Sequence, residues 1–205
     1  MSENERSPAS EMTIGVAILA GGRSSRMGRP KATLTIGGNT LIERIAVESV
    51  RSGLGAPTVI GGESHWAAGS AWVPDEHPGT GPLDGLITAL RTVDADAVLV
   101  LACDLVTPNA QAFDQLAERF RFEQLADPPA DVVAPRSQRR EVLHAVYHGR
   151  IVRQLARSFS RGERSINRAI SSHAIIEINV DSHPHLKASI RDADFPNDLL
   201  EYDVR

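Results

Sequence analysis

Apolar runs and helically spaced apolar stripes alternate along the first 120 residues of the chain. The run at 97–102 (Ala-Val-Leu-Val-Leu-Ala) is apolar at every position, as in a central parallel strand that is covered on both faces. Stripes that recur every three or four residues indicate helices between such runs. Alternation of this kind is typical of a parallel sheet with helices on both faces. The pattern predicts strands at 13–19, 58–60, 72–73 and 97–102, a short extended piece at 33–36, and helices over 40–53, 82–93 and 107–120.

Local sequence signals place the ends of several of these elements. Thr40 and Glu43 have the spacing of a capping box, which starts a helix, and Gly53 is expected to end that helix. Thr107 and Pro108 are expected to form the N-cap and first turn of the third helix. Each of these signals depends only on neighbouring residues.

The second part of the chain, from residue 121 on, has a less regular pattern. No internal repeat and no long linker separates it from the first part, so we expect both parts to form a single domain over 12–205. Residues 1–11 are polar and are expected to form a disordered tail. The second part is predicted to contain strands at 131–134, 142–147 and 174–179, helices at 151–159 and 165–171, and a solvated turn at 183–185.

Composition and charge exclude several classes of protein. At 205 residues, with 41% hydrophobic residues and a mean hydropathy of −0.18, the chain suits one soluble globular domain with a sizeable core. A net charge of −4 argues against a general nucleic-acid binder. No apolar run reaches the roughly 18 residues of a membrane span, and the first residues lack an apolar signal core, so the cytoplasm is the expected location. The single cysteine, Cys103, rules out an internal disulfide.

A glycine-rich, cationic loop follows the first predicted strand. No Asp or Glu occurs between Met12 and Ile42, and Gly21, Gly22 and Gly28 lie among the cations of this segment. Glycine lets the backbone approach an anion closely and expose its N–H groups, so the combination favours a phosphate site over an ordinary basic surface loop. The spacing fits neither a Walker A loop nor a dinucleotide fingerprint. The cations are Arg23, Arg26, Arg29 and Lys31.

Asp104 directly follows the most hydrophobic predicted strand. Ligands of open α/β sheets bind at the carboxyl ends of the strands, and a carboxylate there is well placed to hold Mg²⁺ beside phosphate oxygens. On position alone, a turn or helix-capping aspartate is an equal alternative. For the neighbouring Cys103, a buried structural role is favoured over a thiol nucleophile because no histidine lies nearby in the sequence.

Three further segments carry candidate functional residues. The loop 74–85 is rich in glycine and proline and opens a helix, so its backbone N–H groups are candidates for ligand binding, with an ordinary long turn as the alternative. Asp192 and Asp194 are separated by one residue and could share a metal with Asp104, although taken alone a solvated acidic turn before a last helix is the better interpretation. The arginines that could meet an anionic substrate are Arg136, Arg139 and Arg140.

Taken together, these motifs resemble the molybdenum cofactor guanylyltransferases within the wider nucleotidyltransferase group. The resemblance covers nearly everything after Thr13, and the motifs occur in the family's order. The chain departs from the family pattern at Ala102, where proline is usual, at Pro108, which comes late, and in the last motif at Asp194 and Phe195. The matching segments are Leu19-Ala20-Gly21-Gly22-x-Ser24-x-Arg26-Met27-Gly28-x-x-Lys31, Pro78-Gly79-x-Gly81-Pro82-Leu83-x-Gly85, Cys103-Asp104, 142–147, 162–165 and Asp192-x-Asp194-x-Pro196-x-Asp198-Leu199.

This resemblance implies a Rossmann-like, three-layer α/β/α nucleotidyltransferase fold with a nucleotide-binding half (12–120) and a substrate-side half (121–205). It implies Mg²⁺ on Asp104, shared with Asp192 or Asp194, and attack by the terminal phosphate of molybdopterin on the α-phosphorus of GTP, with release of pyrophosphate. Arg26, Lys31 and Asp104 would be the catalytic residues. The nucleotide would contact Leu19, Ala20, Gly21, Gly22, Ser24, Arg26, Met27, Gly28, Lys31, Asp75, Gly81, Pro82, Leu83 and Gly85.

Three alternatives to a guanylyltransferase stay open on the sequence. The nearest is a cytidylyltransferase acting on the same pterin, although Ala20-Gly21-Gly22 resembles the guanine-specific group. The others are a transferase for another phosphorylated metabolite and a nucleotide-binding adaptor without catalysis, which only the altered last motif supports. Transient contact with molybdenum-insertion and cofactor-delivery proteins follows by family analogy alone. No nucleic-acid or membrane partner is expected.

Overall fold

The computed structural model describes residues 12–21 and 30–193 of the chain. A seven-stranded sheet runs through them in the order β5-β4-β1-β6-β8-β7-β9. Neighbouring strands are parallel except around β8, which runs antiparallel to both β6 and β7. The predicted mostly parallel sheet is therefore confirmed. The strands are β1 (Ile14–Leu19), β4 (Thr58–Ile60), β5 (Ala71–Val73), β6 (Ala97–Ala102), β7 (Val132–Arg136), β8 (His144–His148) and β9 (Ile175–Asn179).

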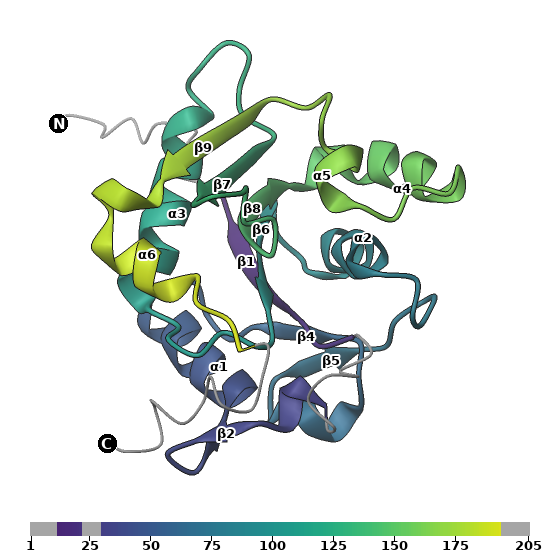
Figure 1. Ribbon diagram of the computed structural model, residues 1–205. Coiled ribbons are helices and arrows are strands. Elements are labelled where there is room, and N and C mark those ends of the chain that lie inside the picture. The colour runs from purple at the N-terminus through teal and green to yellow at the C-terminus, as the bar shows by residue number, and fades with distance from the viewer. Residues whose placement is uncertain (1–11, 22–29, 194–205) are drawn as a thin grey trace, which may run out of the picture.

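Helices cover both faces of this sheet, with α1, α3 and α6 on one side and α2, α4 and α5 on the other (Figure 1). Successive residues of the central strands point to opposite faces of the sheet and pack into two separate cores. Leu99 packs with the first group of helices and Val100 with the second. The three-layer α/β/α class is thus confirmed. The helices are α1 (Leu41–Arg51), α2 (Pro82–Thr92), α3 (Ala110–Glu123), α4 (Val152–Ser160), α5 (Ile166–Ala169) and α6 (Pro184–Ser189).

The capping box predicted for α1 is confirmed in full. The Thr40 hydroxyl accepts a hydrogen bond from the Glu43 N–H at 3.2 Å, and the Thr40 N–H donates to the Glu43 carboxylate at 2.6 Å. Two of the N–H groups that a helix start leaves without partners are satisfied in this way. Thr40 is also the last residue of β3 (Asn39–Thr40), which pairs with β2 (Thr35–Ile36) in a small antiparallel hairpin.

The predicted start of α3 at Thr107 and Pro108 is wrong. Asn109 is the N-cap, and its side chain accepts a hydrogen bond from the Ala112 N–H at 3.1 Å. The Thr107 hydroxyl instead donates to the Ala188 carbonyl at 2.5 Å, a contact made only by the tertiary structure. Both residues are reasonable caps, and the long-range bond decides between them.

Several boundaries in irregular segments also differ from the prediction. The extended piece at 33–36 shortens to β2, because a 3-10 turn at Lys31–Thr33 precedes it. The solvated turn expected at 183–185 is wrong, since α6 begins at Pro184, a residue that fits the first helical turn. The helix expected at 165–171 shortens to α5. The last helix, expected after the acidic turn, lies outside the described residues.

Cys103 follows β6 and packs against the core on the α3 side of the sheet. Burial, reinforced by the negative charge of Asp104, raises the pKa of the thiol to about 12. The thiolate is therefore not the form present at neutral pH, which agrees with a structural role. In the described part of the chain, no helix is long and apolar enough to cross a membrane.

Candidate active site

The carboxyl ends of β1 and β6 lie side by side and open the candidate site. Leu19 and Ala102 are register partners at the last position of these two parallel strands, and the Cys103 N–H donates to the Leu19 carbonyl at 3.3 Å. The glycine-rich segment therefore leaves the sheet next to Asp104. This is the edge at which open parallel sheets bind ligands.

Lys31 and Asp104 meet at this edge although 73 positions separate them in the chain. The Lys31 ammonium lies 2.7 Å from the Asp104 carboxylate, and both side chains are mostly buried, at 20% and 15% exposure. The 3-10 turn Lys31–Thr33 brings the lysine back toward the sheet. A cation and a carboxylate from two predicted motifs thus form one contact.

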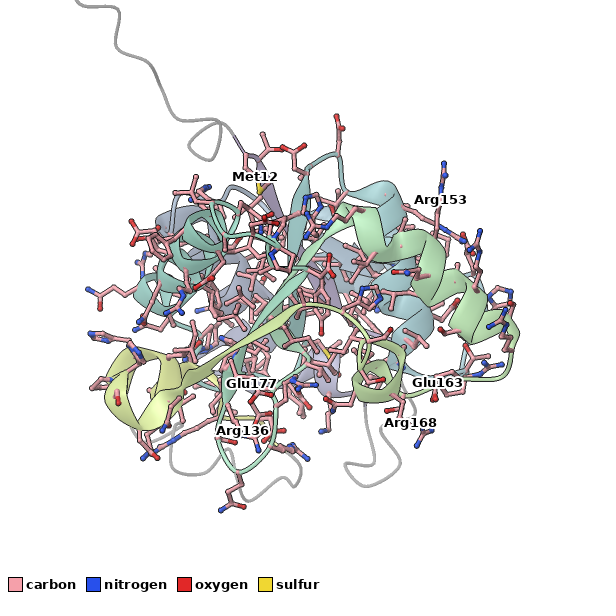
Figure 2. The ribbon with its side chains drawn as sticks, turned by 90° about the horizontal axis from the view of Figure 1, so that it is seen from above. Met12, Arg136, Arg153, Glu163, Arg168 and Glu177 are labelled. Atoms are coloured by element: carbon pink, nitrogen blue, oxygen red, sulfur yellow. The ribbon has the colours of Figure 1, made fainter. Side chains whose placement is uncertain are left out.

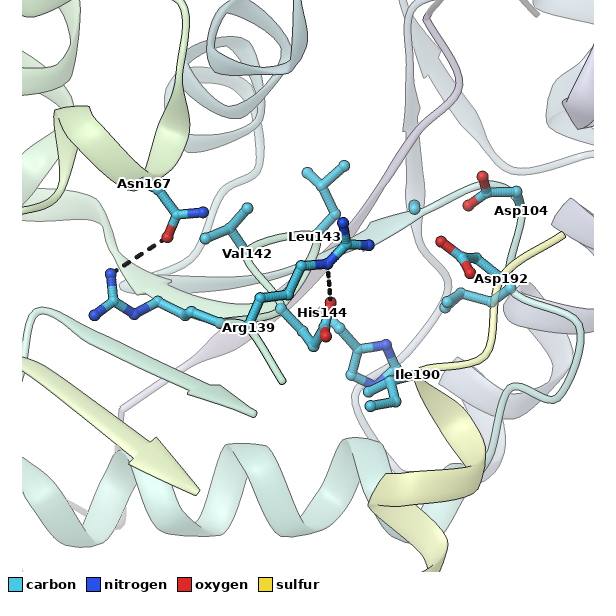
Figure 3. Close-up of a pocket in the computed structure, with 12 residues that line it drawn as sticks. Asp104, Arg139, Val142, Leu143, His144, Asn167, Ile190 and Asp192 are labelled. Atoms are coloured by element: carbon cyan, nitrogen blue, oxygen red, sulfur yellow. Dashed lines mark hydrogen bonds and ion pairs between the residues drawn. The ribbon is translucent and has the colours of Figure 1, made fainter. Parts of the chain in front are cut away.

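Asp192 joins the same region from the other end of the chain. Its backbone bridges Leu105, and the Ala193 N–H donates to the Asp104 carbonyl at 3.0 Å. Both carboxylates line one pocket of about 280 Å³, and Figure 3 shows them together at one end of it, with Asn167 at the other. Asp192 is exposed, so the acidic turn is solvated as expected, yet it also stands beside Asp104.

Asp75 lies on the opposite side of the strand ends, in the loop that follows β5. Its carboxylate packs so closely against Gly21 and Gly61 that a side chain at either position would collide with it. Burial, and secondarily the charge of Asp84, raises the pKa of Asp75. The Asp75 side chain lines two adjoining pockets, one of which also contains Trp66.

The start of α2 is built from backbone rather than from a side-chain cap. Gly81 is the N-cap at φ +104°, a conformation that favours glycine, and Pro82 occupies the first turn. The loop before it is held by Asp84, which accepts hydrogen bonds from the His77 N–H at 3.0 Å and meets the His77 ring nitrogen at the same distance. These contacts hold the loop before α2 in place, and Gly81 and Pro82 line a pocket together with Asp75.

The other predicted nucleotide residues fall into three groups. Leu83 is fully buried in the core, so neither its side chain nor its backbone is exposed to a ligand in this structure. Gly85 lets α2 pack against Leu19, whereas Ala20 continues β1 by donating its N–H to the Ile60 carbonyl at 2.8 Å. The remaining predicted site residues lie outside the described part of the chain, namely Gly22, Ser24, Arg26, Met27, Gly28 and Asp194.

Most of the positive charge predicted for an anionic substrate is already engaged within the fold. Arg136 and Arg140 both contact Glu177, at 2.9 and 2.7 Å, and Figure 2 shows Arg136 beside Glu177. Arg139 differs, since its side chain is 77% exposed and lies 3.6 Å from Glu141. The pairing with Glu177, which comes from β9, is invisible in the local sequence.

Several residues that line these pockets were not among the predicted site residues. Trp66 and Trp72 line the pocket beside Asp75, and Asn167 and His144 line the pocket beside Asp104. The one signal that pointed to the tryptophans is their scarcity, because the chain contains only two and both lie here. Asn167 carries no comparable signal, whereas His144 lies in the segment 142–147 that resembles the family.

The family profile of the MobA-like NTP transferase domain matches residues 16–176, from within β1 to within β9. The chain belongs to this family. It is accordingly a nucleotidyltransferase, an enzyme of the transferase class connected with molybdenum cofactor biosynthesis.

Curated relatives of this MobA-like chain share about a third of its residues. It is 32% identical to a probable molybdenum cofactor guanylyltransferase of Carboxydothermus hydrogenoformans over 86% of this chain and 80% of the relative. It is 31% identical to the protein of the same description from Methanothermobacter thermautotrophicus, over 90% and 96% of the two chains.

Solved structures support the same fold for the MobA-like chain. Molybdopterin-guanine dinucleotide biosynthesis protein A from Archaeoglobus fulgidus superposes with a TM-score of 0.73 at 22% identity, covering 92% of this chain and 96% of the other. A CMP:2-keto-3-deoxy-manno-octonic acid synthetase complexed with CTP superposes with a TM-score of 0.65 at 15% identity, over 92% and 96% of the two chains. At these identities the likeness establishes the fold alone.

Nucleotidyltransferases of the MobA-like kind generally use a divalent metal ion. The carboxylates of Asp104 and Asp192 line one pocket, and carboxylate oxygens are the ligands that Mg²⁺ takes from proteins. The residues present therefore fit such an ion. A second group of possible ligands, Glu76, His77 and Asp84, lies at the start of α2, but its aspartate is already hydrogen-bonded to the histidine.

Proposed function

We propose that this protein transfers GMP from GTP to the terminal phosphate of the molybdenum–molybdopterin cofactor, giving the guanine dinucleotide cofactor and pyrophosphate. The observation that carries the proposal is the meeting of Lys31 and Asp104, at 2.7 Å, where β1 and β6 end. The names of the curated relatives support the same substrates. The nucleotide would lie on the half formed by 12–120 and the acceptor on the half formed by 121–205, in the cytoplasm.

This reaction needs alignment and charge neutralisation more than acid–base chemistry. The attacking phosphate of the acceptor is already an anion, so no residue has to remove its proton. Lys31 would donate hydrogen bonds to the phosphate oxygens of GTP, with Arg26 in support. Asp104 and Asp192 would hold Mg²⁺, which when bound would offset the negative charge of the triphosphate.

Asp75 supports guanine as the preferred base. Guanine presents two N–H donors on one edge, and a carboxylate is the side chain that accepts both. Cytosine presents a single amine beside a ring acceptor, which a carboxylate repels. The Asp75 carboxylate is held rigidly between Gly21 and Gly61 and lines the two pockets beside the strand ends. We therefore assign base recognition to Asp75.

Replacing Asp75 by asparagine is expected to lower the affinity for GTP about 10- to 100-fold, because one donor of guanine would then face an amide N–H. The affinity for CTP should change little. Because both tryptophans line the pocket beside Asp75, their fluorescence reports titrations with GTP, CTP, UTP and ATP in the presence of Mg²⁺. Asp181→Asn, at an exposed position, is the control. A preference of the unaltered protein for CTP would show that it is a cytidylyltransferase.

The acceptor is expected to bind in the pocket between Asp104 and Asn167. Arg139 is the exposed cation at its rim, so Arg139→Ala should raise KM for molybdopterin about tenfold, the effect of losing one charge-assisted hydrogen bond, and leave KM for GTP unchanged. The exposed Arg153 on α4 supplies a matched control. Equal KM values for the acceptor in Arg139→Ala and Arg153→Ala would place the acceptor elsewhere.

Release of pyrophosphate distinguishes a transferase that acts on molybdopterin from a transferase for another metabolite and from a nucleotide-binding adaptor. Mixing the protein with GTP, Mg²⁺ and molybdopterin should release pyrophosphate in step with guanine dinucleotide formation. Release with another phosphorylated metabolite, and not with molybdopterin, would identify a different acceptor. Binding of GTP without release in any mixture would favour a nucleotide-binding adaptor. Transient contact with molybdenum-insertion or cofactor-delivery proteins would follow from the product, which another protein has to receive.

A further inference from the structure

His144 is a polar residue at a position where the sheet is otherwise apolar. It is the first residue of β8, opposite Leu101 of β6, and only 2% of it is exposed. Its ring lies 5.7 Å from that of Phe113, and burial lowers its pKa to about 3, so the imidazole is neutral at physiological pH. Within the described residues, Nδ1 has no hydrogen-bond partner. A buried atom without a partner is unfavourable, so an apolar residue would suit the core better.

Among residues 12–21 and 30–193, the His144 side chain makes its one hydrogen bond to α6. Its Nε2 lies 3.2 Å from the hydroxyl of Ser189, the last residue of that helix, and Ser189 is itself fully buried. Because the two residues come from β8 and α6, this bond ties the end of the helix to the central sheet. It is the feature that offsets the cost of burying an imidazole here.

The segment that follows Ser189 runs directly to the two candidate metal ligands. The Val106 N–H donates to the Arg191 carbonyl at 3.0 Å, and Asp192 then bridges Leu105. Only two residues, Ile190 and Arg191, therefore separate Ser189 from Asp192 in the chain. His144 and Asp192 also line the same pocket, as Figure 3 shows. A shift of the α6 end would carry Asp192 away from Asp104.

We propose that His144 and Ser189 are positioning residues, which hold the end of α6 so that Asp192 stands beside Asp104 at one divalent cation. The inference rests on the proposed function, since that function makes the two aspartates metal ligands. It goes further in assigning a role to two buried residues that touch neither the metal nor the nucleotide. Neither residue is a catalytic residue.

The test measures binding of Mn²⁺ alone to the full chain, by the EPR signal of the free ion, together with the free energy of unfolding. Ser189→Ala and His144→Phe are expected to raise the Kd for Mn²⁺ about five- to tenfold, and Ser189→Thr, which keeps the hydroxyl, should restore it. Ser49→Ala is the matched control. Ser49 is also fully buried and donates to the Gly55 carbonyl at 2.6 Å, so its loss should affect unfolding and leave Mn²⁺ binding within twofold.

A double-mutant cycle with Asp192→Asn shows whether the effect passes through Asp192. If Ser189 acts by placing that carboxylate, Ser189→Ala has no further effect on the Kd once Asp192 is asparagine. An unchanged Kd in Ser189→Ala, with the loss of stability seen for Ser49→Ala, would make the pair merely structural. Asp104→Asn tests the metal site itself, separately from the positioning role of His144 and Ser189. If it leaves Mn²⁺ binding unchanged, the metal site is wrong and the positioning role is overturned with it.

Discussion

Lys31→Met should lower kcat for pyrophosphate release at least 100-fold while leaving the fold intact. The lysine ammonium and the Asp104 carboxylate are mostly buried and 2.7 Å apart, so the charge acts where water screens it little. Loss of one such group from a transition state of growing negative charge costs roughly 3 kcal/mol, by analogy with an oxyanion-hole donor. Steady-state pyrophosphate release with GTP and molybdopterin measures the effect. Asp104→Asn should have an effect at least as large.

For metal binding, the expected effect of Lys31→Met is the opposite of its effect on turnover. In the nucleotide-free protein, the Lys31 ammonium competes with a cation for the Asp104 carboxylate. Lys31→Met should therefore bind Mn²⁺ more tightly than the unaltered protein, although it turns over more slowly. Asp104→Asn should lose both Mn²⁺ binding and turnover. This pattern distinguishes a direct role of the pair from general damage, which would weaken binding and turnover together.

Lys187→Met is the matched control for the lysine variant. Its ammonium also lies 2.7 Å from a carboxylate, that of Asp181, but both side chains are largely exposed at 59% and 71%. Exposed ion pairs contribute little, so turnover and Mn²⁺ binding should both remain near normal. Near-normal turnover in Lys31→Met as well would place the phosphate site somewhere other than the ends of β1 and β6.

The protein is expected to lose stability in mild acid because of His144. Burial lowers the pKa of this histidine from 6.5 to about 3, so between these values the unfolded chain binds a proton that the folded chain does not. The contribution of neutral His144 to the free energy of unfolding is therefore complete above pH 6.5 and is lost as pH falls toward 3. At about 1.4 kcal/mol per pH unit for one proton, the free energy of unfolding should fall by roughly 2 kcal/mol between pH 6 and pH 4.

Urea unfolding at several pH values measures this slope. His144→Phe should flatten it between pH 6 and 4 by about the amount expected for one proton, whatever the variant's absolute stability. His65→Phe is the control, because the His65 side chain is 70% exposed. His148, whose pKa burial also lowers, contributes to the slope in every variant. An unchanged slope in His144→Phe would mean that another group is responsible for the acid sensitivity.

Much of the fold could be predicted because its signals are local. The apolar run at 97–102 forms β6, the most enclosed strand, and the Thr40 and Glu43 capping box starts α1. Both depend on residues within a few positions of one another. Before α3, the local signal at Thr107 predicted the wrong helix start, because the N-cap is Asn109. A bond from Thr107 to a carbonyl 81 positions away decided the outcome.

The candidate site shows the same division more sharply. The glycine-rich cationic segment, Asp104 and the 74–85 loop were each predicted to be functional from their composition and their place after predicted strands. Their mutual arrangement could not be predicted, because it depends on which strands become neighbours. Arg136 and Arg140 are examples, since their charges are offset by Glu177 on β9. Arg139, at the pocket rim, is largely exposed and pairs with Glu141 instead.

The sequence by itself therefore determined the α/β class and the order of the elements, because periodicity and caps act over short stretches of chain. For the glycine-rich motif it predicted phosphate binding. Only the tertiary structure decided that Lys31 meets Asp104, that Asp192 joins them, and that His144 ties α6 to the sheet. His144 and Ser189 are 45 positions apart in the chain, and Lys31 and Asp104 are 73 positions apart. Such contacts form only when burial of both sheet faces selects one strand order.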